Sequence, residues 1–176
     1  ENDDPDWVTG CPPCTDFSVL GRSNHRRIDP DEVRRRMREA RTHLHFCVQV
    51  YRNQLSRGND VLHEHLLGAS SWREEGVYVL ANDPHVSTVV GDLCRYDLKI
   101  TDAGGIVKSI KKPTRWMSSS SEMLERLKNI CDNSRQHGSL LDGKAKHAAI
   151  WPNKLCIDIL KGMRDTAFFQ GTQGGS

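Results

Sequence analysis

Long apolar runs are absent from this sequence, and their absence limits where the protein can act. No run approaches the roughly 20 residues that cross a bilayer, which predicts no transmembrane helix and no membrane partner. The first residues, ENDDPDW, lack the basic and apolar regions of a secretory signal. Six cysteines do not suggest a disulfide scaffold, and Cys47, Cys131 and Cys156 fall on predicted apolar helix faces. We therefore expect an intracellular protein, nuclear or cytoplasmic, with reduced thiols.

The length of 176 residues suits one hydrophobic core and is short for two ordinary domains. An apolar content of 36% with a mean hydropathy of −0.61 is low but still globular. We expect a single α/β domain over residues 1–170 and a flexible tail over residues 171–176, GTQGGS. The sequence does not begin with methionine, so we expect it to be cut from a longer polypeptide.

Charge is distributed unevenly, although the formal net charge is only +2. Residues 1–16 carry five acids and no base, whereas residues 21–57 carry ten arginines against four acids. If the second stretch is a helix with one apolar face, its arginines form a positive outer face that binds the phosphates of DNA or another nucleic acid. The residues expected to make that contact are Arg34, Arg35, Arg38 and Arg41. The alternative is a solvated face whose arginines pair with neighbouring acids.

The clearest predicted element is a helix that begins after Asp29 and stops at Gly58. Asp29 is placed to cap it, Pro30 occupies the first helical position, and Glu32 lies three residues after the cap. Apolar residues then recur every three or four positions and form a stripe of Val33, Met37, Ala40, Leu44, Cys47, Val48, Tyr51 and Leu55. Strands are expected over residues 6–10, 60–66, 87–93 and 113–119, and a hairpin turn over 101–105. Further helices are expected over residues 72–81, from 120 or 121, and from 152. The second of them is expected to direct inward the side chains of Met123, Leu124, Leu127 and Ile130.

This order of elements predicts a Rossmann-like, mostly parallel sheet with flanking helices. In such sheets, ligands collect at the carboxyl ends of the strands. Two motifs lie there. GCPPCTDFS, residues 10–18, follows the first strand, and His63-Glu64-His65 lies at the end of the second. We expect the two motifs to face one another.

The first motif resembles the nucleophile loop of the DNA cytosine-5 methyltransferases, which reads G-x-P-P-C-Q-x-F-S and is often followed shortly by glycine. Seven positions match: Gly10, Pro12, Pro13, Cys14, Phe17, Ser18 and Gly21. Thr15 stands where the family has glutamine. The second motif keeps the acid of the family's Glu-Asn-Val strand end. KKPTRW keeps Pro113 and Arg115 of the family's Pro-Gln-x-Arg-x-Arg segment. The resemblance spans residues 7 to 116 in the right order.

The resemblance implies a methyltransferase-type fold and nucleophilic attack on cytosine in DNA. Cys14 would add to ring carbon 6, Glu64 would hold and protonate the ring nitrogen, and Arg115 would fix a phosphate or the pyrimidine carbonyl. The base would have to leave the duplex. The family's glycine-rich S-adenosylmethionine loop has no counterpart in this sequence. We therefore expect a partial fold, a catalytic fragment whose methyl transfer needs a cofactor-binding half from a second chain or a longer parent polypeptide.

Other functions remain open on the same residues. One is a zinc site, because Cys11 and Cys14 have the spacing of half a zinc knuckle, and His63 and His65, two apart on a strand, point the same way. Another is a non-catalytic nucleic-acid-binding module that keeps the fold and the arginine-rich helix. A thioredoxin-like CxxC is the least favoured, because residues 15–21 look like a loop rather than a helix start.

Overall fold

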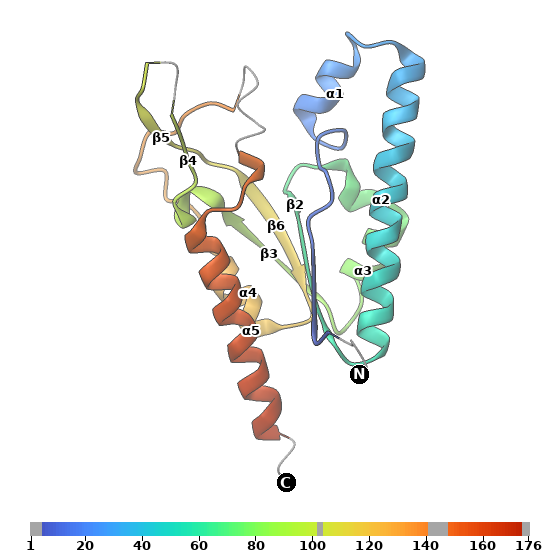
Figure 1. The fold of residues 1–176 in the computed structure, drawn as a ribbon, viewed down its shortest axis with the longest axis vertical. Helices are drawn as coiled ribbons and strands as arrows, with labels where there is room; N and C mark the ends of the chain where they lie inside the picture. The colour runs from blue at the N-terminus through green and yellow to red at the C-terminus, as the bar shows by residue number, and fades with distance from the viewer. Residues whose placement is uncertain (1–4, 102–103, 141–147, 174–176) are drawn as a thin grey trace. The chain divides into compact units, whose positions relative to one another are not determined.

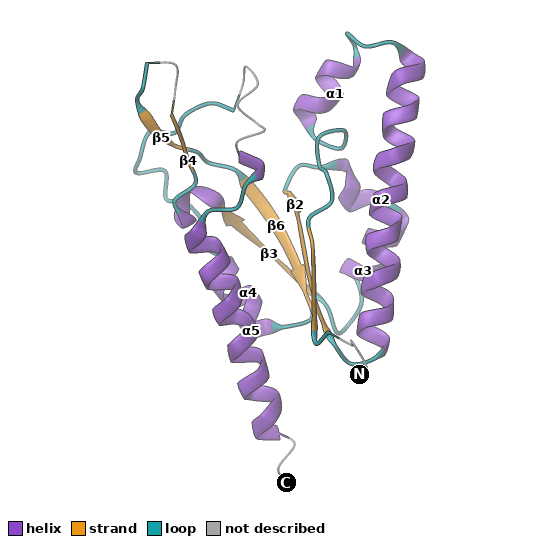
Figure 2. Cartoon of the chain, viewed as in Figure 1, coloured by secondary structure: helices purple, strands orange, loops and turns teal. Residues whose placement is uncertain are grey.

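The computed structural model describes residues 5–101, 104–140 and 148–173. The chain divides into two compact units, Glu1–Thr88 with Arg115–Ser120 and Val89–Thr114 with Ser121–Ser176. Helices and strands occur in both, so this is a mixed α/β protein (Figure 1, Figure 2). None of the described helices combines the length and the apolar character that crossing a bilayer requires. The prediction of one domain over residues 1–170 stays a prediction.

The first unit contains most of the elements that precede residue 88. They are β1 (Trp7–Gly10), α1 (Val19–His25), α2 (Pro30–Ser56), β2 (Asp60–Leu66), the 3-10 helix η1 (Ser70–Arg73) and α3 (Glu75–Ala81). Two strands carry residues of both units, β3 (Ser87–Asp92) and β6 (Pro113–Ser118). The expected strands and the long helix are confirmed. Helix α1 is new, because part of the segment expected to be a loop is helical.

The second unit continues from β3 with a short 3-10 helix and a hairpin. Its elements are η2 (Leu93–Tyr96), β4 (Lys99–Thr101), β5 (Val107–Ser109), α4 (Ser121–Leu127) and α5 (Asn153–Gln173). Strands β4 and β5 pair antiparallel, as the predicted hairpin requires, while Asp102 and Ala103 of its turn lie outside the described residues. Helix α5 includes residues 171–173 of the expected tail, and residues 174–176 lie outside the described residues.

The four-stranded sheet has the order β1-β2-β6-β3 and is mixed rather than mostly parallel. Strands β1 and β2 are parallel, with Gly10 level with His63. Strand β6 runs the other way, because its last residue, Ser118, donates a hydrogen bond from Oγ to the carbonyl oxygen of Val61 at the start of β2, at 2.7 Å. The expected parallel pairing is confirmed for β1 with β2, and it is wrong for β2 with β6.

Helix α2 forms where the sequence predicts it and supplies much of the core of the first unit. Asp29 Oδ1 accepts hydrogen bonds from the backbone amides of Asp31 and Glu32, and Gly58 follows the helix with a φ of 76°. Figure 1 shows α2 running beside β1 and β2. Its buried face packs in a cluster of apolar side chains: Phe17, Leu44, Cys47, Val48, Tyr51, Val61, Ala69, Trp72, Val77, Leu80, Val86 and Met117.

Helix α4 is shorter than its apolar pattern predicts. Met123, Leu124 and Leu127 are buried, as expected. Ile130 was expected to face inward, but the helix ends at Leu127 and the side chain of Ile130 is exposed. The prediction that Cys131 lies on a helix face is also wrong, because the segment that follows α4 is a loop (Figure 2).

Candidate functional site

The chain leaves the carboxyl end of β1 at Gly10, forms a tight loop and enters α1 at Val19. The side chain of Phe17 is fully buried and anchors the loop in the core. The amide of Phe17 donates to the carbonyl of Cys14 at 3.2 Å. Ser18 Oγ donates to the carbonyl of Thr15 at 2.8 Å and accepts from the amide of Gly21 at 2.9 Å. These bonds fix the backbone that follows the half-buried Cys14.

Two glycines of this loop are required by close approach. A Cβ atom on Gly10 would lie 1.9 Å from the hydroxyl oxygen of Tyr51. A Cβ atom on Gly21 would lie 1.7 Å from the carbonyl oxygen of Thr15. Real Cβ contacts are never this short, so any side chain at either position would displace the loop or the helix beside it.

The loop is bound to β2 through a buried histidine. The imidazole Nε2 of His65 lies 2.9 Å from the carbonyl oxygen of Pro12, and Nδ1 is hydrogen-bonded to the hydroxyl of Ser71. A carbonyl oxygen only accepts, so Nε2 carries the proton and the serine hydroxyl donates to Nδ1. Both ring nitrogens of His65 are therefore occupied, and the bond to Pro12 positions the residues next to Cys14.

His63 is buried beside Tyr51 and Trp72. Its Nδ1 lies 3.0 Å from the Tyr51 hydroxyl, and its ring centre lies 5.3 Å from that of Trp72. Within the described part of the chain, Nε2 has no hydrogen-bond partner. Burial, and secondarily the neighbouring charge of His65, lowers the pKa of His63 to about 3. His63 is thus a neutral core side chain at physiological pH.

Cys14 and Glu64 both lie toward the carboxyl ends of β1 and β2. Because Gly10 is level with His63, Glu64 lies one residue beyond the end of β1, and Cys14 is on the loop that leaves that end. Glu64 is buried, with 4% of its surface exposed. Side chains alternate along a strand, so Glu64 faces the side of the sheet opposite to His63 and His65.

Arg115 lies on the same face of the sheet as the two histidines. Its guanidinium carbon is 5.1 Å from the centre of the Trp72 ring, within the range of a cation–π contact. The indole nitrogen of Trp72 donates to the carbonyl of Leu66 at 2.9 Å, which fixes that ring at the end of β2. The structure therefore places Arg115 near the β2 end but on the other face from Glu64.

Sequence reasoning missed three residues that support this loop, namely Tyr51, Ser71 and Trp72. Tyr51 was identified only as one member of the apolar stripe of α2. Its hydroxyl shows its second role, since it contacts His63 and fills the space above Gly10. No spacing rule connects Ser71 and Trp72 to the loop, because both act through side-chain hydrogen bonds at the end of β2.

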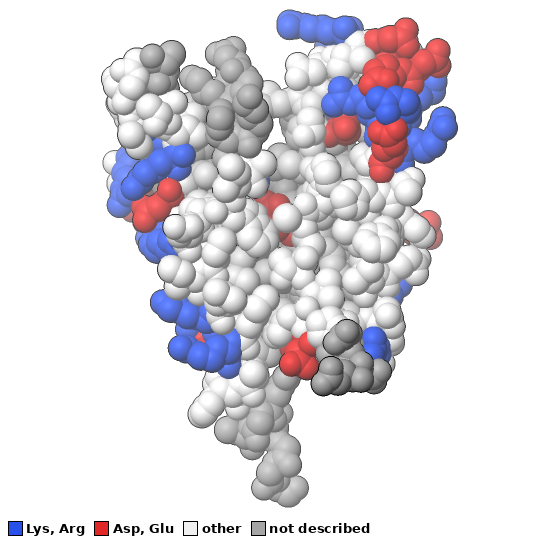
Figure 3. Space-filling view, in the orientation of Figure 1, with Lys and Arg blue, Asp and Glu red and all other residues white. Residues whose placement is uncertain are grey.

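The arginines of α2 are largely engaged with acids. Arg35 bonds to Glu32 at 2.7 Å and to Glu39 at 2.5 Å, and the same two carboxylates raise its pKa above its ordinary value. Arg34 pairs with Asp31, Arg36 with Asp16 at 3.1 Å, and Arg41 with Glu74 at 3.1 Å. Arg38 is exposed. Figure 3 shows basic and acidic side chains intermixed over the N-terminal part of the helix, as in the solvated-face alternative.

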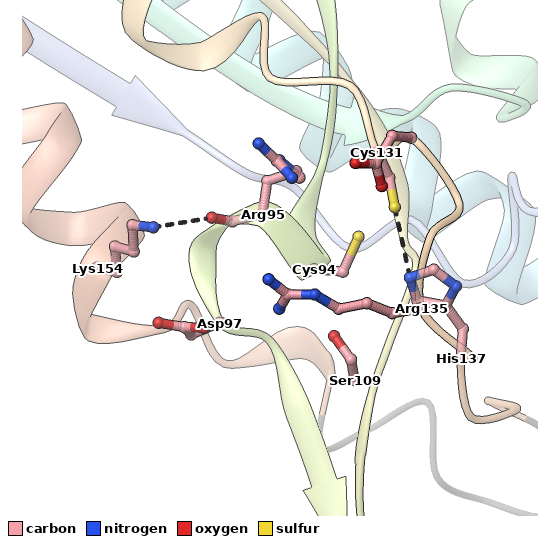
Figure 4. A pocket seen from close by; sticks show the side chains of 9 residues that line it. Cys94, Arg95, Asp97, Ser109, Cys131, Arg135, His137 and Lys154 are labelled. Atoms are coloured by element: carbon pink, nitrogen blue, oxygen red, sulfur yellow. Dashed lines mark hydrogen bonds between the residues drawn. The ribbon is translucent and has the colours of Figure 1, made fainter.

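The residues expected as an alternative zinc site do not form the group that could hold a metal ion. Cys11 is exposed, Cys14 is half-buried, and both nitrogens of His65 are hydrogen-bonded. Among the described residues, the side chains whose ligand atoms converge are Cys94, Cys131 and His137, all in the second unit (Figure 4). Burial raises the pKa of the Cys94 thiol to about 11, with a smaller effect of Cys131.

Comparison with models of protein families, with curated proteins and with solved structures finds no match to this chain. The residues also do not fit S-adenosylmethionine, the cofactor implied by the family resemblance. No two glycines in the sequence are separated by a single residue. The G-x-G turn that lets a nucleotide-type cofactor approach the backbone at the end of a strand is therefore missing from this sequence.

Proposed function

We propose that this chain is the nucleophile-bearing part of a Rossmann-like, cytosine-5-methyltransferase-like fold that acts on DNA. The observation that carries the proposal is the hydrogen bond between Pro12 of the cysteine loop and His65 of β2. It holds the loop of Cys14 against the strand that carries Glu64. A nucleophile and a general acid on adjacent strand ends are the arrangement that addition to a pyrimidine ring needs.

In the proposed reaction, the Cys14 thiolate donates an electron pair to carbon 6 of cytosine. The 5,6 double bond moves to the 4,5 position, and the π electrons of the bond between carbon 4 and nitrogen 3 move onto nitrogen 3, which takes a proton from the Glu64 carboxyl group. Carbon 5 becomes nucleophilic and accepts a proton from solvent. When carbon 5 then loses its original proton, the thiolate leaves and the proton on nitrogen 3 returns to Glu64. The net change is exchange of the hydrogen on carbon 5.

Methyl transfer would place a methyl group on that carbon instead of a proton. It would require S-adenosylmethionine held by residues of another chain or of a longer polypeptide. The exchange reaction needs neither and therefore tests the nucleophile directly.

Arg115 is assigned a contact with a DNA phosphate rather than with the pyrimidine carbonyl. It lies on the face of the sheet opposite to Glu64, and its guanidinium group stacks on Trp72. The ion pairs of the α2 arginines oppose strong binding of DNA by that helix. We expect contacts of Arg34, Arg35, Arg38 and Arg41 with phosphates to be weak and sensitive to salt.

The experiment measures deuterium uptake at carbon 5 of cytosine in single-stranded and duplex DNA incubated with the protein in heavy water, by mass spectrometry of the released nucleosides. We expect uptake with the unmodified protein and none with Cys14→Ala. Glu64→Gln should slow it by about 10²- to 10⁴-fold, the usual contribution of a general acid. Single strands should react faster, because no base pair has to open.

Cys11→Ser is the matched control, because Cys11 lies three residues from Cys14 and is exposed. This variant should keep the full exchange rate. Equal exchange by the unmodified protein and Cys14→Ala would overturn the proposal. Binding of DNA without any exchange would favour the non-catalytic nucleic-acid module.

A further inference from the structure

Three side chains from two separate parts of the sequence converge in the second unit. Cys94 lies in η2, Cys131 lies four residues after α4, and His137 lies on the loop that continues from there. Their sulfur and nitrogen atoms all lie within 4.8 Å of one another, and both cysteines are buried. Figure 4 shows the two sulfur atoms and the imidazole ring directed toward one another.

The distance between Cys131 and His137 matches that of two ligands of a zinc ion. Cys131 Sγ and His137 Nε2 are 3.5 Å apart. With Zn–S near 2.3 Å and Zn–N near 2.0 Å, tetrahedral ligands of these two kinds are separated by about 3.5 Å. A zinc ion would therefore require little movement of this pair. Thiolate and imidazole are also the ligand types that zinc prefers.

The surrounding backbone holds the Cys131 sulfur in place. The amide of Asn133 donates to Cys131 Sγ at 3.4 Å, and Asn133 adopts the left-handed conformation with a φ of 58° that this tight turn requires. The amide of Cys131 donates to Asp92 Oδ2 at 2.8 Å. Amide groups directed at a sulfur atom offset the negative charge of a thiolate, as the outer-shell donors of metal sites do.

His137 is held by the edge of β5. It forms an isolated bridge with Ser109, and the amide of Gly138 donates to the Ser109 carbonyl at 2.8 Å. A Cβ atom on Gly138 would lie 2.9 Å from Ile110 and 3.0 Å from Lys108, so the loop lies close against this segment. Apart from this bridge, residues 128–140 belong to no helix or strand. A metal ion would give this loop a cross-link that its backbone does not supply.

We propose that the second unit binds one zinc ion through Cys94 Sγ, Cys131 Sγ and His137 Nε2. The ion ties the loop after α4 to η2 and β5. Three protein ligands leave one position of a tetrahedral ion for a small molecule. The three ligand residues line a cavity of about 150 Å³, together with the basic residues Arg95, Arg135 and Lys154. Water fits there at about 30 Å³ per molecule. The site is independent of Cys14 and of the function proposed above.

The first test is the metal content of the full chain, purified without chelator and then reconstituted with zinc chloride. We expect one zinc ion per chain, and none after Cys131→Ser. The double variant Cys11→Ser with Cys14→Ser is the matched control and should keep its zinc. Substoichiometric zinc in the reconstituted protein, or loss of zinc from the control alone, would overturn the proposal. So would a disulfide between Cys94 and Cys131 in the purified protein.

The second test does not depend on whether Cys131→Ser folds. Cobalt is added to the unmodified protein in place of zinc, and the absorption spectrum is recorded. Two thiolate ligands should produce sulfur-to-cobalt charge-transfer absorption with the ligand-field bands of a tetrahedral ion. His137→Gln should change the ligand-field bands and keep the charge transfer. Octahedral bands without charge transfer would contradict the assignment.

Discussion

Each unit of this protein has a set of two cysteines and one or two histidines considered as metal ligands, and the two sets behave in opposite ways. In the first unit, Cys11 and Cys14 have the spacing of half a zinc knuckle, and His63 and His65 alternate correctly on a strand. Nevertheless, the imidazole of His63 is hydrogen-bonded to Tyr51. The imidazole of His65 is hydrogen-bonded to Ser71 and to the Pro12 carbonyl. In the second unit, the ligand atoms converge although no local spacing predicts it.

The difference shows what separates a structural histidine from a candidate ligand. His65 has both nitrogens engaged with protein groups, so a metal would have to break two buried hydrogen bonds. His137 directs Nε2 at the sulfur of Cys131. The contact of His137 is with a potential co-ligand, whereas the contacts of His65 position a loop. The identity of the groups that the imidazoles contact, rather than the sequence spacing, distinguishes the two sets. Nε2 of His137 contacts a cysteine sulfur, whereas the hydrogen-bonded nitrogens of His63 and His65 contact Tyr51, Ser71 and the Pro12 carbonyl.

Thiol labelling offers the sharpest way to break this comparison. Cys94 and Cys131 should resist alkylation until a strong zinc chelator is added, and then react at two sites per chain. Cys11 should react at once, whether or not chelator is present, because it is exposed. Mass spectrometry of labelled peptides gives both rates. Cys47, which is buried in the first unit, is the control for burial alone. If the chelator increases the alkylation rate of Cys47 as much as that of Cys131, the fold protects the thiols and a metal does not.

Gly10→Ala should produce a large loss of stability in the first unit. The new Cβ atom would lie 1.9 Å from the Tyr51 hydroxyl, so the loop or α2 must shift. Overpacking of this kind costs about 1–3 kcal/mol or more in the free energy of unfolding. Urea denaturation measures it. Gly68→Ala is the matched control, because no atom lies within 4 Å of its Cβ position. An equal loss in both variants would mean that the close approach to Tyr51 has no energetic role.

Acid should weaken the first unit through His63, whose pKa in the folded protein is lowered to about 3 by burial. The unfolded chain binds a proton at this side chain as the pH falls through its ordinary value of 6.5, while the folded protein does not. The contribution of His63 is therefore complete above about pH 6.5 and is lost between there and pH 3, by about 1.4 kcal/mol per pH unit.

The free energy of unfolding measured by urea between pH 7 and pH 4.5 tests this dependence. In His63→Leu, the free energy of unfolding should depend less steeply on pH than in the unmodified protein. The difference should correspond to the uptake of one proton on unfolding. Identical slopes would show that His63 becomes protonated without unfolding. Zinc release from the second unit in the same pH range should be unchanged by His63→Leu.

The smallest effect is expected at the surface of α2. Arg34→Glu, Arg38→Glu and Arg41→Glu together should leave the unfolding midpoint nearly unchanged, because these side chains are solvent-exposed. If the helix binds nucleic acid, the triple variant should lose retention of a labelled duplex and a labelled single strand on filters. For the unmodified protein, a plot of the logarithm of the binding constant against the logarithm of the salt concentration should have a slope of roughly −0.9 per phosphate contact. No retention of either at low salt would show a merely solvated face.

Local signals in the sequence predicted much of the fold. The Asp29 cap, Pro30 and Gly58 defined α2 because capping and helix ending depend on nearby residues. The strands were found from their apolar and β-branched runs. The direction of β6 was not found, because nothing within residues 113–118 distinguishes a parallel from an antiparallel neighbour. That direction depends on contacts of Ser118 with the distant start of β2.

The candidate sites were predicted unevenly for the same reason. The loop around Cys14 was recognised because its glycines, prolines and cysteine are contiguous. The role of Cys131 was missed, since an apolar spacing assigned it to a helix that in fact ends at Leu127. Its partner His137 lies six residues farther along the same loop, but Cys94 comes from η2, and only the fold of the second unit brings all three together.

Helix α2 has a consequence for the motions of the first unit. It extends over 27 residues, or about 40 Å, yet its fully buried residues all lie between positions 44 and 54. The half that begins at Pro30 is stabilised by exposed ion pairs and by half-buried side chains. Exposed ion pairs add little to stability, so this half can open while the core remains closed. Amide hydrogens should therefore exchange with deuterated solvent early near Pro30 and late near Tyr51, which places the slowest-opening part of the helix directly above Gly10.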